Sequence, residues 1–261
     1  MNKHLATLNE KLLGAYGIIA FFLLWEMGPR VGWADPQFIP PLSKVLLAGW
    51  KLAVTGDLFI HISASLQRYF AGLVLAVLVG VPLGFVLGGW FPRLAKFLDP
   101  LLKLFSQVSA FSLFPIIILF FGIGEAGKIS IIFWSSIWPV LFTTIAGVKH
   151  IDPIYIKSAR SMGADKATTF FKVILPGAAP SIFTGIRLAS TVAFLMLIAA
   201  EMIGASAGLG YLANKTCCLE FIVRSFAATL TIALLGMGLN YFIHWLEDNT
   251  VTWKEESVTP L

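Results

Sequence analysis

Charged residues are scarce in this sequence. Asp, Glu, Lys and Arg make up 13% of its 261 positions, whereas a soluble globular protein carries about 25%. Hydrophobic residues make up 57%, and the mean hydropathy is +0.84. So few polar side chains cannot cover a water-soluble body, and we infer that lipid surrounds most of the surface. The net charge of +5 comes from basic residues in short loops rather than from a basic stripe, so no nucleic-acid partner is expected.

Cysteine is nearly absent, and the common catalytic motifs are missing. Cys217 and Cys218 are adjacent, which gives neither a metal-ligand spacing nor a disulfide framework. They are interpreted as two small apolar residues, with a vicinal disulfide as the alternative. The histidines lie apart and form no HExxH motif, and neither GxxxxGK(S/T) nor GxSxG occurs. We therefore expect no catalytic residue, metal site or cofactor on this chain, and an energy source in another subunit or an ion gradient.

Long apolar runs dominate what is present, and they predict an all-α membrane protein with six transmembrane helices. A retained first helix is favoured over a cleaved signal peptide, because no small-x-small cleavage site follows the first run. The predicted spans are Leu12–Met27, Arg68–Gly89, Leu101–Phe121, Ile129–Val148, Ile182–Ile203 and Phe226–Trp245.

Basic residues are distributed unequally between alternate loops. Eleven Lys and Arg residues lie on one side and five on the other, where Arg30, Lys44, Lys51, Lys128 and Lys215 are found. Since cytoplasmic loops carry the excess, both termini are predicted to be cytoplasmic. The chain then divides into a cytoplasmic stub with the first helix (1–28), an extracytoplasmic loop (29–67), a five-helix core with a cytoplasmic loop at 149–181 (68–246), and a solvated cytoplasmic tail (247–261).

The cytoplasmic loop is expected to contain two short amphipathic helices. Asp152 followed by Pro153 is a favourable helix start, and Tyr155, Ala159 and Met162 then share one face. Gly163 should end this first helix. Asp165 should start a second that runs through Lys172 and stops at Leu175-Pro176-Gly177. Such a pair could lie on the membrane surface or dock into a groove on a soluble partner.

A motif in this loop resembles the "EAA" loop of binding-protein-dependent ABC importer permeases. The stretch Lys157–Gly163, nine further residues and then Val173–Pro176 follow the pattern E-A-A-x-x-x-G, nine residues, I-x-L-P. The sequence keeps the second alanine, the glycine, the leucine and the proline of that pattern. It departs from it where Lys157 replaces the glutamate and Ser158 the first alanine, so an acid from Asp152, Asp165 or the partner would have to compensate.

Flanking segments extend the resemblance to the sulfonate/taurine/nitrate permease branch over about residues 35–246. They are Leu66-Gln67-Arg68 with Gly72, Gly80–Gly84, Gly185-Ile186-Arg187, Ala200–Gly204 and Gly208–Leu212. The resemblance implies the type I importer permease fold in the bacterial cytoplasmic (inner) membrane, with lipid around it and a second copy completing a homodimer.

The resemblance also implies that separate subunits bind the solute, move it across the membrane and hydrolyse ATP. An extracytoplasmic binding protein would deliver a small anion such as a sulfonate, taurine, nitrate or bicarbonate, and a separate cytoplasmic ATPase would supply ATP and Mg. Each loop would seat a coupling helix in that ATPase, and rocking spans would alternate access. The alternative is a secondary transporter or channel without an ATPase. The residues expected to couple to the ATPase are Asp152, Tyr155, Lys157, Ala159, Arg160, Met162, Gly163, Asp165, Leu175 and Pro176.

Four polar residues in or near the spans are candidates for the translocation pathway or a gate: Arg68, Ser109, Arg187 and Glu201. A carboxylate late in an apolar run must be neutralised, paired or hydrated, so Glu201 is expected either to face the bundle interior or to be an interfacial acid that meets Lys215 or backbone amides. Arg68 and Arg187 have the sign to attract an anion, but could instead reach lipid headgroups. Ser109 could equally be a helix-packing contact.

Overall fold

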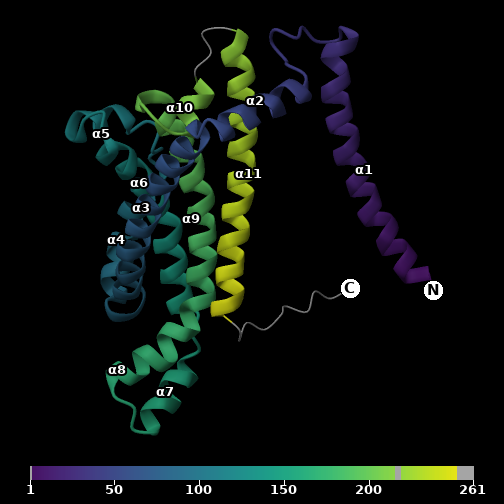
Figure 1. Cartoon of the computed structure of the whole chain (residues 1–261). Coiled ribbons are helices and arrows are strands. Elements are labelled where there is room, and N and C mark those ends of the chain that lie inside the picture. The colour runs from purple at the N-terminus through teal and green to yellow at the C-terminus, as the bar shows by residue number, and fades with distance from the viewer. Residues whose placement is uncertain (1, 215–218, 252–261) are drawn as a thin grey trace.

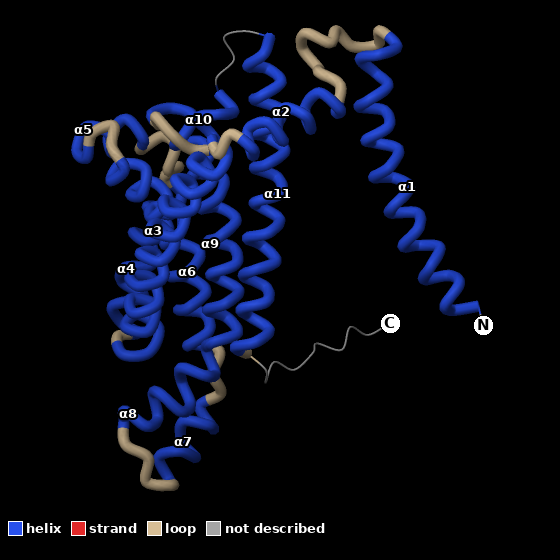
Figure 2. The backbone as a smooth tube through the Cα atoms, viewed as in Figure 1, coloured by secondary structure: helices blue, strands red, loops and turns tan. Residues whose placement is uncertain are grey.

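The computed structural model describes residues 2–214 and 219–251, and this part of the chain is helical without a β-strand. Loops gather at the two ends of a helical bundle (Figure 2). The elements are α1 (Asn2–Val31), α2 (Leu42–Val54), α3 (Asp57–Phe85), the π-helical turn η1 (Val86–Trp90), α4 (Pro92–Gln107), α5 (Phe114–Phe121), α6 (Glu125–Lys149), α7 (Pro153–Ser161), α8 (Lys166–Thr169), the π-helical turn η2 (Phe170–Ile174), α9 (Leu175–Gly204), α10 (Leu209–Asn214) and α11 (Leu219–Thr250).

Four upright helices form the bundle. They are long and apolar enough to cross a membrane, and they comprise α3 with η1, α6, α8 through α9, and α11. α6 packs between α3 and α9, and α11 contacts α9 and α2. α1 includes the predicted first span Leu12–Met27 and stands apart from the bundle (Figure 1). The total of six spans therefore remains a prediction.

Small residues bring α3 and α6 close together. The Cβ of an alanine at Gly72 would lie 2.5 Å from Ile132, and at Gly80 it would lie 3.1 Å from Val140. Hydrophobic attraction between helices is weak in lipid, so close van der Waals contact over such glycines holds membrane helices together. Tyr69 is fully buried in the cluster at this contact.

The predicted span Leu101–Phe121 is not one helix. α4 ends at Gln107, Val108 has extended backbone angles, and α5 begins only at Phe114. The Val108 carbonyl, which the break removes from the helical ladder, accepts a hydrogen bond from Trp134 Nε1 of α6 at 3.4 Å. This tertiary contact offsets the lost backbone hydrogen bond, so hydropathy alone could not locate the break.

The helix that contains Arg68 starts earlier than the sequence predicted. α3 begins at Asp57, eleven residues before Arg68, and α2 precedes it within the predicted loop 29–67. Polar residues in the first turns of α3 lower its hydropathy without interrupting the helix. Arg68 therefore lies well inside a helix and not at its end.

At the end of the bundle where α6 is connected to α9, α7, α8 and η2 form a lobe (Figure 1). The Asp152 carboxylate caps α7 by accepting a hydrogen bond from the Ile154 amide at 2.8 Å, and Asp165 caps α8 through the Thr168 amide at 3.0 Å. Gly163 lies between them with φ +81°, a backbone conformation that favours glycine. The predicted starts and the glycine break are confirmed.

The predicted stop at Leu175-Pro176-Gly177 is wrong. The helix continues without interruption from Lys166 to Gly204. The π-helical turn η2 ends at Ile174, and Pro176 is then the second residue of α9. The wider hydrogen-bond ring of η2 shifts the ladder where the proline lacks a donor, so the helix is not broken.

Candidate functional site

Residues 150–174, called here the projecting lobe, extend past the ends of α3, α6 and α11 (Figure 1). Its apolar side chains are largely uncovered: Tyr155 is 66% exposed and Met162 is 87% exposed. Ala159, on the same face of α7, is half-buried. The arrangement matches the predicted amphipathic face and leaves it open to a partner.

The other predicted coupling residues fall into two groups. Asp152, Lys157, Arg160, Gly163 and Asp165 are exposed on the lobe, whereas Leu175 and Pro176 are half-buried where the lobe meets α9. Two hydrogen bonds to the exposed Asp165, from the Thr168 hydroxyl and the Thr168 amide, lower the pKa of its carboxyl group. The carboxylate is therefore charged at neutral pH and favours the start of α8.

The lobe is joined to the bundle by its chain connections to α6 and α9 and by an apolar contact. Phe170 of η2 packs edge-on against Phe85 at the end of α3, with ring centroids 5.1 Å apart. Beside this contact is a cavity of about 740 Å³, lined by aromatic residues and by Arg160 and Lys166. The apolar contact thus adds to the two chain connections, from α6 and into the continuous helix of α9.

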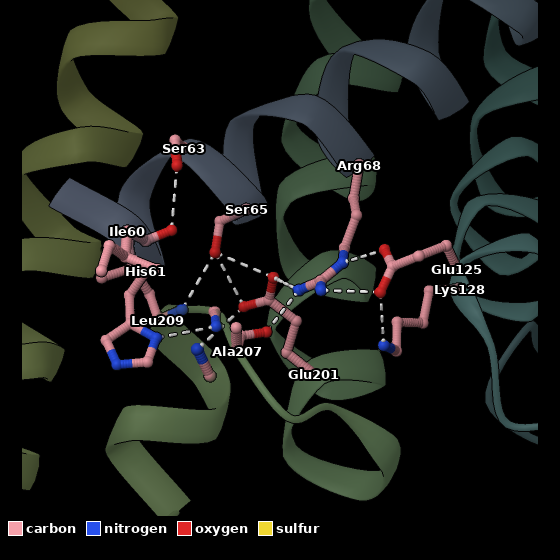
Figure 3. A network of polar contacts seen from close by, with 12 residues as sticks. Ile60, His61, Ser63, Ser65, Arg68, Glu125, Lys128, Glu201, Ala207 and Leu209 are labelled. Carbon is pink, nitrogen blue, oxygen red and sulfur yellow. Dashed lines mark hydrogen bonds and ion pairs between the residues drawn. The ribbon is translucent and has the colours of Figure 1, made fainter. Parts of the chain in front are cut away.

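The end of the bundle opposite the lobe contains a buried ion-pair network centred on Arg68 (Figure 3). The Nε and Nη2 atoms of Arg68 donate to the two carboxylate oxygens of Glu125 at 2.5 and 2.8 Å. Nη1 donates to Glu201 and to the Ala207 carbonyl, both at 2.6 Å. Lys128 Nζ completes the network with a 3.0 Å contact to Glu125. Two cations and two anions from α3, α6 and α9 therefore neutralise one another.

Glu201 is 0% exposed and has donors on both carboxylate oxygens. The Ser65 hydroxyl lies 2.8 and 2.9 Å from the two oxygens, and the Gly210 amide donates to one of them at 2.9 Å. The chain passes very close to this carboxylate after α9. A Cβ at Gly208, where φ is +133°, would overlap the carboxylate, and a Cβ at Gly210 would lie 2.8 Å from the Glu201 Cβ.

The structure gives each pathway candidate a definite place. Arg68 is buried and paired with two carboxylates, so it does not reach lipid headgroups. Glu201 faces the interior, and the Gly210 amide is one of its partners; Lys215, its other expected partner, lies outside the described residues. Arg187 lies 3.4 Å from Glu247, which is buried, so the interpretation of Glu247 as part of a solvated tail is wrong. α11 continues to Thr250 and holds Glu247 against α9.

Ser109 lies apart from these ion pairs in sequence and structure. It is exposed in the irregular connection between α4 and α5, where its carbonyl accepts a hydrogen bond from the Leu113 amide at 3.2 Å. Its position is that of a turn residue and not of a contact between long helices.

Sequence reasoning missed Ser65, Glu125 and Lys128 as members of the network. A signal was available: ionisable groups next to apolar spans need partners, and an acid and a lysine three residues apart begin the span Glu125–Lys149. Their closeness to Arg68 could not be read from spacing.

A family model described as "Binding-protein-dependent transport system inner membrane component" matches residues 80–251. The chain is 33% identical to the taurine transport system permease protein TauC of Escherichia coli, over 95% of this chain and 92% of that protein. It is 34% identical to the putative aliphatic sulfonates transport permease protein SsuC of Escherichia coli, with coverages of 91% and 89%.

A third relative and a solved structure extend the comparison. The chain is 31% identical to the bicarbonate transport system permease protein CmpB of Synechocystis sp., over 89% of this chain and 86% of that protein. The fold is similar to a chain in an inward-facing structure of the MetNI methionine ABC transporter, with a TM-score of 0.61. That likeness covers 75% of this chain and 94% of the other at 19% identity, and so concerns the fold.

Proposed function

The chain belongs to the family of binding-protein-dependent transport system inner membrane components and is a permease component of an ABC importer; from this we propose that it moves a small anion across the bacterial inner membrane by alternating access. A separate cytoplasmic ATPase holds ATP and Mg, an extracytoplasmic binding protein delivers the solute, and two copies of this chain form the pathway. The termini and the projecting lobe lie on the cytoplasmic side.

The substrate class is supported by the relatives. The names of three of them specify taurine, aliphatic sulfonates and bicarbonate. These solutes share a compact anionic head with two or three oxygens. We therefore assign a sulfonate or carboxylate of similar size to this chain as its solute class. The rest of the solute is recognised by the binding protein.

The projecting lobe carries the proposal of ATPase coupling. It presents Tyr155 and Met162 to solvent on a short helix that is capped at Asp152 and ended by a glycine with positive φ. An amphipathic helix that seats its apolar face in a groove is a common mode of recognition between proteins. Because η2 joins the lobe to α9 in one continuous helix, a movement of the docked lobe is passed to a membrane-spanning helix.

The test begins with affinity purification of the chain from its native host in mild detergent, followed by mass spectrometry. Recovery of a soluble ATPase and an exported binding protein is the expected result. Repeated recovery of the chain alone, with solute flux into liposomes that contain no ATP, would instead establish a self-contained transporter or channel.

Replacement of Gly163 by valine then tests the lobe. A side chain at φ +81° costs about 1–3 kcal/mol of backbone strain, which should distort the lobe and reduce both ATPase recovery and ATP-driven uptake at least five-fold. The matched control is Gly56→Val, because Gly56 has φ +84° and, like Gly163, nothing within 4 Å of an added Cβ, but lies between α2 and α3. Equal losses of ATPase in both variants would count against docking through the lobe.

A further inference from the structure

The ion-pair network has one carboxylate that is held permanently and one that is not. Glu201 is fully buried and receives hydrogen bonds from Arg68, from the Ser65 hydroxyl and from the Gly210 amide. Glu125 is 58% exposed and is the first residue of α6, and its ion pairs within the described part of the chain are with Arg68 and Lys128. A change of side-chain rotamer is enough to move Glu125 away, whereas Glu201 cannot leave without opening the bundle.

Departure of Glu125 would leave a preorganised set of donors. Arg68 Nη1 stays bound to Glu201 and to the Ala207 carbonyl, so the guanidinium keeps its position and turns its Nε and Nη2 edge outward. Lys128 Nζ donates to Oε1 of Glu125, the oxygen that Arg68 Nη2 also contacts. Figure 3 shows Glu125 and Glu201 on opposite sides of the Arg68 guanidinium. Both cationic side chains are almost completely buried while Glu125 covers them.

We propose that Arg68 and Lys128 form a binding site for the anionic head of the transported solute, and that Glu125 occupies this site until the solute displaces it. The inference rests on the proposed function and names the residues that meet the solute at the end of the bundle away from the lobe. Three N–H donors now converge on Glu125, at 2.5, 2.8 and 3.0 Å. They suit a sulfonate with three oxygens or a carboxylate with two.

Charge balance supports an exchange of one anion for another. With Glu125 in place, the network contains two positive and two negative groups. Departure of Glu125 without replacement would leave an uncompensated positive charge next to a buried ion pair, which is strongly unfavourable. A monoanionic solute restores neutrality, whereas a neutral or cationic solute of the same size does not. Glu125 therefore selects against solutes without an anionic head.

The experiment uses the full-length chain in its complex with the ATPase, in lipid nanodiscs, with methanesulfonate as the probe. The thermal unfolding midpoint is measured against probe concentration at constant ionic strength for wild type and Glu125→Gln. Without probe, the variant should melt below wild type. Methanesulfonate should restore its midpoint, with a half-effect concentration at least ten-fold lower than in wild type, because a tethered carboxylate competes at high effective concentration. Adding Lys128→Met to Glu125→Gln should weaken this response.

Two further variants keep the inference falsifiable. Glu26→Gln removes another carboxylate paired with an arginine, Arg30, away from the network, and should respond to methanesulfonate as wild type does. Glu125→Asp keeps the charge on a shorter arm and should give a half-effect concentration between those of wild type and Glu125→Gln. Another order among these three, or equal responses of Glu125→Gln and Glu26→Gln, would overturn the inference.

Failure of this inference is distinguishable from failure of the proposed function. A complex that imports its solute with ATP but shows no difference between Glu125→Gln and Glu26→Gln overturns the anion site alone. A chain that recovers no ATPase overturns the proposed function, and the methanesulfonate titration can then be made on the chain by itself.

Discussion

Replacement of Glu201 by glutamine is the sharpest test of the network's part in stability. Glutamine retains one acceptor oxygen but directs an NH2 group at donors that now face a carboxylate, among them the Ser65 hydroxyl and the Gly210 amide. Removing one partner of a buried ion pair typically destabilises a protein by about 3–5 kcal/mol. Arg68 keeps its contacts with Glu125 and the Ala207 carbonyl, so we expect the free energy of unfolding to fall by about 3 kcal/mol rather than about 5 kcal/mol.

The assay is reversible unfolding of the purified chain in mixed micelles with increasing sodium dodecyl sulfate, followed by circular dichroism. Glu125→Gln is the internal comparison: its side chain is 58% exposed, so water replaces part of the lost contact, and its loss should be smaller than that of Glu201→Gln. In the double variant Arg68→Met with Glu201→Leu, no unpaired charge remains next to position 201. Its loss of stability should therefore be smaller than the sum of the losses in Arg68→Met and in Glu201→Leu.

Two results would refute this reasoning. A loss below about 1 kcal/mol for Glu201→Gln would mean that the buried carboxylate is already neutral or hydrated. Additive losses in the double variant would mean that Arg68 and Glu201 do not interact in the folded chain, despite the 2.6 Å contact.

Two further predictions concern packing and pH. Gly72→Ala should destabilise the contact of α3 with α6 by about 1–3 kcal/mol because its Cβ meets Ile132, whereas Gly238→Ala, with nothing within 4 Å, should be neutral or stabilising in the same unfolding assay. The lowered pKa of Asp165 means that its cap stabilises α8 above the ordinary aspartate pKa and is lost as pH falls through the lowered value, below about pH 4. Amide exchange at Thr168, corrected for intrinsic rates, should rise over that range in wild type and show no such step in Asp165→Asn.

The projecting lobe was predictable from sequence because its determinants are local. A cap acts on an amide two or three residues away, as Asp152 does on Ile154 and Asp165 on Thr168. A positive φ at Gly163 is likewise a property of one residue. The stop at Pro176 was mispredicted because its outcome depends on a π-helical turn, which no residue pattern in this sequence signals.

The network was not predictable in the same way. Arg68 is 57 residues from Glu125 and 133 from Glu201, and hydropathy records only that each is polar. The interruption between α4 and α5 is similar, because Trp134, 26 residues after Val108, decides whether that break is tolerated. The position of Glu201 in an apolar run indicated that it needs a partner. The sequence did not identify Arg68 as that partner, because Arg68 was expected at the end of a span and lies inside α3.

The glycines after α9 were recognised in the sequence, but their physical role is visible only in the structure. The resemblance included Ala200–Gly204 and Gly208–Leu212 without a physical reason for either segment. The reason is steric: no side chain fits at Gly208 against the Glu201 carboxylate, and the amide of Gly210 must approach close enough to donate to it. The segment thus closes over Glu201 and fixes the Arg68 edge that Glu125 covers.

The same helix that ends at this network begins at the projecting lobe. α9 has 30 residues and spans about 45 Å at 1.5 Å per residue, with Glu201 near one end and η2 at the other. Exchange of Glu125 for a solute anion changes the contacts of Arg68, which holds Glu201 and hence the end of α9. Docking of the lobe acts on the opposite end of that helix. The two proposals therefore have one physical element in common, and a variant such as Glu201→Gln should alter the response of ATPase activity to solute even though no atom of Glu201 meets either the solute or the ATPase.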